Sequence, residues 1–133
     1  MLFLNYNLKM KLIKILFFLL NLILIIFYIY PGSIFGCIFY KDCSIQPQLT
    51  KDYFISSNHF YTFLFISLYG FTLFYQNYKN FIIFYLLSLS VILETSHLII
   101  PNRSFQFSDI FGNIIGVIIS FLIIKFIYTW RQK

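Results

Sequence analysis

Apolar residues in this chain gather in four long stretches, at about residues 12–30, 59–75, 81–100 and 109–128. An α-helix needs about 20 predominantly apolar residues to cross the hydrocarbon core of a bilayer. The pattern therefore predicts an all-α fold, an integral membrane four-helix bundle. We expect one domain over residues 1–133, because four spans leave no sequence for a second domain.

The segments between these stretches contain residues that typically end helices. Pro31 and Gly32 follow the first stretch, and Pro101 follows the third. The second and third stretches are joined by a short connection at residues 76–79, and so short a connection predicts an antiparallel helix pair. Residues 31–57 are predicted to form an outer loop, within which 34–40 is apolar and aromatic enough to lie in the membrane interface.

Small residues recur at every fourth position of the last stretch, at Gly112, Gly116 and Ser120. Such a stripe allows two helices to pack closely in lipid. Asp109 stands at the start of the same stretch, where its carboxylate can cap the free amide groups of the first turn. We therefore assign helix packing to the stripe.

The overall composition agrees with a membrane protein. Hydrophobic residues make up 60% of the chain and charged residues 11%, whereas soluble domains carry about 25% charged residues. The net charge is +6, but the basic residues lie mostly at the ends of the apolar stretches. Their position indicates membrane topology, so we predict the lipid bilayer as a partner and no nucleic acid.

The distribution of basic residues predicts that both termini are cytoplasmic, because loops rich in Lys and Arg stay on that side. The basic region before the first stretch is typical of a signal anchor, with a cleaved signal peptide as the alternative. Seven basic residues then fall inside and three outside: Lys9, Lys11, Lys14, Lys79, Lys125, Arg131 and Lys133 against Lys41, Lys51 and Arg103.

Two cysteines, Cys37 and Cys43, both lie in the predicted outer loop. A disulfide could form between them in an oxidising compartment. Two free thiols are the alternative, because two cysteines do not make a disulfide framework. Neither a CxxC pair nor a zinc-finger spacing is present, so we predict no metal site and no cofactor.

The polar side chains with a chemical use gather near one end of the predicted spans. An ionisable residue at the centre of a bilayer costs about 2.5 to 3.5 kcal/mol on insertion scales, so Glu94 needs partners. Threading the four spans brings these residues to the outer surface, and we expect a hydrogen-bonded unit with His59 at its edge. The predicted unit contains Glu94, Arg103, Asp109 and Asn113, and His97 lies three residues after Glu94 on the same helix face.

Three roles for these residues stay open at this point. They can form a purely structural unit that fixes helix register. They can bind a lipid headgroup or a lipid-linked cell-wall precursor at the outer leaflet, with Arg103 on a phosphate. They can also act in catalysis or hold a metal ion, but no known catalytic motif is present. We therefore assign no catalytic residue and expect a protein that is not an enzyme.

The order of these residues resembles the VanZ-like family of small integral membrane proteins. The family pattern is a membrane Glu and a Gln, then Pro-x-Arg, then Asp and a helix with Asn and Gly. His59 and Phe60 match an earlier family element, in which Ile55 and Ser56 replace Asp and Lys. His97 stands in place of the Gln, and Ser120 in place of a second small residue. The matching residues are Glu94, Pro101, Arg103, Ser108, Asp109, Asn113 and Gly116.

The resemblance implies a multi-pass protein of the bacterial cytoplasmic membrane. Some VanZ-like proteins are associated with lowered susceptibility to the glycopeptide teicoplanin, which implies a role in the cell envelope and antibiotic resistance. The alternatives are a small membrane enzyme that acts on a lipid or lipid-linked precursor, and a structural subunit of a membrane complex. Neither the sequence nor the resemblance predicts the ligand or the oligomeric state.

Overall fold

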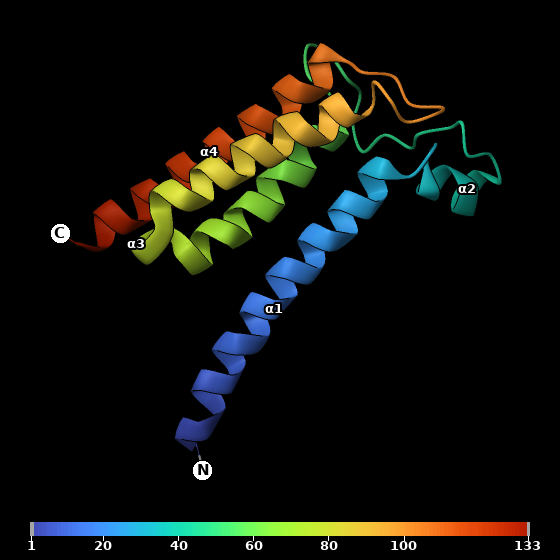
Figure 1. Ribbon diagram of the computed structural model, residues 1–133. Helices are drawn as coiled ribbons and strands as arrows, with labels where there is room; N and C mark the ends of the chain where they lie inside the picture. The colour runs from blue at the N-terminus through green and yellow to red at the C-terminus, as the bar shows by residue number, and fades with distance from the viewer. Residues whose placement is uncertain (1, 133) are drawn as a thin grey trace.

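The computed structural model describes residues 2–132, which form four α-helices and no strand (Figure 1). Helix α1 spans Leu2–Ile29, α2 Ile34–Tyr40, α3 Ser57–Ser96 and α4 Phe107–Arg131. Helices α1, α3 and α4 are each long and apolar enough to cross a membrane. The predicted all-α fold is thus confirmed. Lys133, which we counted among the cytoplasmic residues, lies outside the described part of the chain.

Helix α3 contains the second predicted span and most of the third, which we predicted to run to residue 100, whereas the helix ends at Ser96. Its backbone leaves helical geometry at Tyr78, where φ is −135° and ψ is 29°, within the connection predicted at 76–79. The chain reverses there, as Figure 1 shows for the green and yellow parts of α3. Nδ1 of His59 lies 3.7 Å from Oε2 of Glu94, although these residues would be about 50 Å apart on a straight helix. Helix α3 is therefore two antiparallel arms.

Helix α4 packs backbone to backbone against the first arm of α3. A Cβ atom on Gly112 would lie 2.8 Å from the carbonyl oxygen of Ser56, and one on Gly116 would lie 2.7 Å from that of Phe60. The hydroxyl of Ser120 donates to the carbonyl oxygen of Leu64 at 2.7 Å. The small-residue stripe thus faces α3, where side chains would hold the two helices apart.

Helix α1 begins before the predicted residue 12 and includes the basic residues that precede the apolar stretch. Polar contacts attach it to both arms of α3. The Tyr69 hydroxyl donates to the Ile13 carbonyl oxygen at 2.9 Å, and the Tyr85 hydroxyl donates to Oδ1 of Asn21 at 3.0 Å. Asn21 is buried, so the only polar side chain in the middle of this apolar stretch serves to join helices.

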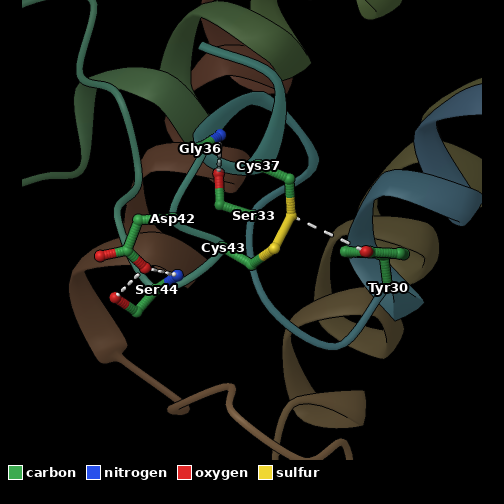
Figure 2. The surroundings of a disulfide bond; sticks show 7 residues. All are labelled: Tyr30, Ser33, Gly36, Cys37, Asp42, Cys43 and Ser44. Carbon is green, nitrogen blue, oxygen red and sulfur yellow. Dashed lines mark hydrogen bonds between the residues drawn. A yellow bond between two sulfur atoms is a disulfide. The ribbon is translucent and has the colours of Figure 1, made fainter. Parts of the chain in front are cut away.

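The loop after α1 contains the short helix α2, which we had expected only as an interfacial segment. Ser33 caps it, because its hydroxyl oxygen accepts a hydrogen bond from the amide of Gly36 at 3.0 Å. A disulfide joins Cys37, in the middle of α2, to Cys43, which answers the question that the sequence left open. Figure 2 shows this bond beside the Tyr30 ring. The hydrogen bonds from Ser44 lower the pKa of the Asp42 carboxyl below its usual value.

Large side chains fill the space where α1, α4 and the two arms of α3 meet. Phe17, Phe63, Phe71, Leu86 and Val117 are almost completely buried. Other large apolar side chains lie on the outside of α3 and α4, such as Phe65, Phe81, Phe84 and Phe126. An apolar exterior around an apolar core is what a helix in lipid requires, because the bilayer replaces water as the solvent.

Candidate functional site

Six polar side chains meet at the end of the molecule where α1 ends, both arms of α3 terminate and α4 begins. We call this group the polar cluster. The turn of α3 and the C-terminal end of α4 lie at the opposite end (Figure 1). The cluster consists of Tyr28 from α1, His59 and Glu94 from α3, His97 just after α3, and Asp109 and Asn113 from α4.

Glu94 is fully buried at the centre of the cluster. Its Oε1 atom accepts a hydrogen bond from the amide of Gln106 at 3.2 Å and lies 3.2 Å from Nδ1 of His97. Its Oε2 atom is also buried and has no hydrogen-bond partner. One oxygen of this carboxyl group therefore fixes the loop before α4, while the other faces the cluster without a donor.

His59 connects both carboxyl groups of the cluster. Its Nδ1 atom lies 2.9 Å from the Tyr28 hydroxyl, and its Nε2 atom lies 3.3 Å from Oδ2 of Asp109. Its Nδ1 is also 3.7 Å from Oε2 of Glu94. We had placed His59 at the edge of the unit, and the structure places it in the middle, because the start of the first arm lies against both the end of the second arm and the start of α4.

The hydrogen-bond directions around Tyr28 follow from Asn113. The Asn113 amide donates to the carbonyl oxygen of Ser90 at 3.3 Å, which leaves its Oδ1 as the acceptor for the Tyr28 hydroxyl at 3.0 Å. The Tyr28 oxygen must then accept from Nδ1–H of His59. In a neutral ring, Nε2 of His59 then presents its lone pair to the Asp109 carboxylate, and a proton or a metal ion between the two atoms would stabilise this contact.

His97 packs flat on the Tyr28 ring, with 5.5 Å between the ring centroids and 14° between the planes. Its Nε2 atom lies 3.2 Å from the backbone carbonyl oxygen of Tyr28, which can only accept, so Nε2 must donate. His97 is only 3% exposed, so the ring is buried within the cluster. The ring lies between the end of α1 and Glu94.

Arg103 does not belong to the hydrogen-bonded unit that we predicted. Its Nε donates to the carbonyl oxygen of Tyr30 at 3.2 Å, and a terminal nitrogen donates to that of Phe27 at 2.8 Å. These are free carbonyl groups at the end of α1, which a cation stabilises. Among residues 2–132, no carboxylate oxygen lies within 4.0 Å of the guanidinium. Partial burial lowers the pKa of Arg103 from its usual value, but a guanidinium stays charged at neutral pH.

A cavity of about 640 Å³ adjoins the polar cluster. It lies between α1, the loop 33–49 and the first arm of α3, and most of its wall is apolar. Polar side chains line it as well, including Asn58, His59, His97 and Arg103. Its volume falls in the range of about 300 to 1,000 Å³ that is usual for pockets that bind small molecules.

The structure thus brings five of the six predicted site residues together and places Arg103 beside them at the cavity. Tyr28 is the member that we missed, because a Tyr at the end of a span is usually an interfacial residue. No family model, curated protein or solved structure matches this chain. The VanZ-like resemblance therefore stays a prediction from residues, and the function must be argued from the geometry of the site.

Proposed function

We propose that this protein binds a phosphate-bearing membrane lipid, or a lipid-linked cell-wall precursor, at the outer surface of the bacterial cytoplasmic membrane. The observation that carries the proposal is the cavity between α1 and α3, whose wall is apolar and which has Arg103 on its lining. An apolar wall suits a hydrocarbon chain, and a guanidinium suits a phosphate, which it can bind through two parallel hydrogen bonds.

The charge of Arg103 supports an anionic ligand over a neutral one. Its partners in the protein are two backbone carbonyl groups, which carry no net charge. The guanidinium has five N–H donors, so donors remain for a ligand after these two bonds. His97 and Asn58 also line the cavity, but their polar atoms already have partners within the protein, which leaves Arg103 as the group for a headgroup.

The proposal includes the topology that the charge distribution predicts. Four membrane crossings, with both termini in the cytoplasm, place the polar cluster at the outer leaflet. His59 and Asp109 each lie two residues inside the start of their helices, about 3 Å along the axis, so the cluster lies near the headgroups. A VanZ-like role in the cell envelope and in teicoplanin susceptibility is consistent with a ligand at this depth.

Lipid analysis of the purified protein tests the proposal. We expect native mass spectrometry to detect a bound phospholipid or polyprenyl phosphate, and Arg103→Gln to reduce its occupancy several-fold. Arg131→Gln is the matched control, because it removes the same charge at the opposite end of α4. Equal occupancy in the Arg103→Gln and Arg131→Gln variants would exclude a phosphate site at Arg103.

A second pair of variants tests the cavity itself. Thr62→Trp adds a large ring to the cavity wall and should displace the lipid chain. Leu122→Trp adds the same ring to an exposed position of α4 and should leave occupancy unchanged. A lipid that is retained in the Thr62→Trp variant would show that its chain binds elsewhere.

A further inference from the structure

We propose that His59, Glu94 and Asp109 bind a divalent transition-metal ion of the Zn²⁺ or Mn²⁺ class. One ligand atom from each of these residues lies within 4.8 Å of the other two. The three side chains come from both arms of α3 and from α4. The fold therefore brings them together, and they do not form a metal-binding motif in the sequence. This inference does not depend on the proposed lipid ligand.

The first argument is the unpartnered oxygen of Glu94. Its Oε2 atom is buried and accepts no hydrogen bond, because Nδ1 of His59 is 3.7 Å away and donates to Tyr28 instead. Burying a carboxylate oxygen without a donor is costly. A metal ion between Glu94, His59 and Asp109 would supply the missing positive partner.

The second argument is the direction of the hydrogen bonds on His59. Because Nδ1–H donates to the Tyr28 oxygen, the lone pair of Nε2 points at the Asp109 carboxylate. The two groups repel each other unless a cation lies between them. Nε2 and Oδ2 are 3.3 Å apart. Two ligands at 2.0 to 2.2 Å from a tetrahedral ion lie roughly 3.3 to 3.6 Å apart. The existing separation therefore already suits two ligands of one ion.

The third argument is the support around these ligands. A metal-binding His usually donates its second N–H to an oxygen, which fixes the orientation of the ring. Tyr28 is that oxygen, and Asn113 holds Tyr28 in turn. The amide of Gln106 donates to the other oxygen of Glu94. Two ligands are thus oriented by groups that are not ligands.

The ligand types select the class of metal ion. Imidazole suits Zn²⁺ and other transition metals, whereas carboxylates also suit Mn²⁺. Three protein ligands leave a coordination position for water or an external ligand, and His59 lines the cavity. Bringing Glu94 into the shell needs a movement on the order of 1 Å, within the reach of side-chain torsions.

Metal analysis of the intact protein in detergent tests the inference. The protein is purified without chelator, equilibrated with Zn²⁺ or Mn²⁺ and desalted. Its metal content is then measured by inductively coupled plasma mass spectrometry. We expect about one ion per chain, and at least tenfold weaker binding in Asp109→Asn and His59→Phe. Tyr28→Phe should weaken binding about tenfold, as the loss of an orienting partner does. Asp42→Asn removes an exposed carboxylate from the outer loop and should change nothing.

Asp109 is the most accessible of the three ligands, with 13% of its side chain exposed, so its Asn variant is the one expected to fold most readily. Elution from a sizing column as a single species shows that each variant is folded. Wild-type protein that holds neither ion overturns the inference and leaves protons as the cations of the cluster. Equal metal content in the wild type and in folded Asp109→Asn also overturns it.

Discussion

Tyr28 joins three helices through a single hydroxyl group. Its oxygen accepts from His59 on α3 and its proton goes to Asn113 on α4, while its ring stacks on His97. The side chain is 7% exposed, so water cannot replace either bond. The orientation of His59, and with it the geometry of both carboxyl groups, therefore depends on a residue that carries no charge.

Replacing Tyr28 with Phe should destabilise the protein by about 1 to 3 kcal/mol, because a buried donor on His59 and a buried acceptor on Asn113 would lose their partner. The substitution keeps the aromatic ring and its stacking on His97 and removes only the hydroxyl. The measurement is the thermal unfolding midpoint in detergent. Tyr30→Phe is the matched control, since Tyr30 is exposed and, among residues 2–132, its hydroxyl forms a hydrogen bond only with the sulfur of Cys37. An equal shift in both variants would contradict this role of Tyr28.

The residues of the site were partly predictable because charge in lipid is expensive. Glu94, Asp109 and His59 stand out against apolar sequence, and the antiparallel threading places them at one depth. Tyr28 does not stand out, because tyrosines are common at span ends. The partners of Arg103 were not predictable either. The free carbonyl groups at the end of α1 attract a cation, and a carboxylate also attracts one. The sequence alone does not show which of these partners lies closer to Arg103.

At the scale of the elements, the interface between α4 and the first arm of α3 is set by backbone contact. A Cβ atom on Gly116 would lie 2.7 Å from the carbonyl oxygen of Phe60 and 2.8 Å from the amide nitrogen of Leu64. Backbone atoms of a packed helix cannot move aside as a side chain can. Gly116 therefore fixes the distance between α3 and α4, and through it the separation of His59 and Asp109.

Gly116→Val should separate these two helices and cost about 1 to 3 kcal/mol or more, as overpacking does. We expect a lower unfolding midpoint and a smaller yield of folded protein. Ile118→Ala, at an exposed position two residues along α4, is the control and should have little effect. A Gly116→Val variant as stable as the wild type would show that the two helices are not in close contact.

The sequence predicted the long helices better than the short one. The turn within α3 lies inside the predicted connection, because Gln76, Asn77 and Lys79 are polar and interrupt the apolar sequence. Helix α2 has seven residues, which is too short for a hydrophobic period to distinguish it from a loop. The start of α1 was also placed too late, because hydropathy marks where the lipid begins and says little about where the helix does.

At the scale of the whole molecule, the fold of α3 decides the topology. Three helices are long enough to span a membrane, and three crossings would put the termini on opposite sides. Helix α3, however, reverses at Tyr78, so that its two arms cross in opposite directions. Four crossings would then put both termini on one side, and from the excess of Lys and Arg there we predict that this side is the cytoplasm.

A cytoplasmic reporter fused after the last residue should consequently be active, and one that works only outside the cell should be silent. The disulfide gives an independent measurement from the other surface. In intact cells, a membrane-impermeant maleimide should leave this protein unlabelled until an impermeant reductant opens the bond between Cys37 and Cys43. It should then label both thiols. Cys37→Ser, which frees Cys43, should be labelled without reduction and serves as the control. If the Cys37→Ser variant is labelled only after the cells are lysed, the loop is cytoplasmic, and the polar cluster and its cavity would then face the inner leaflet.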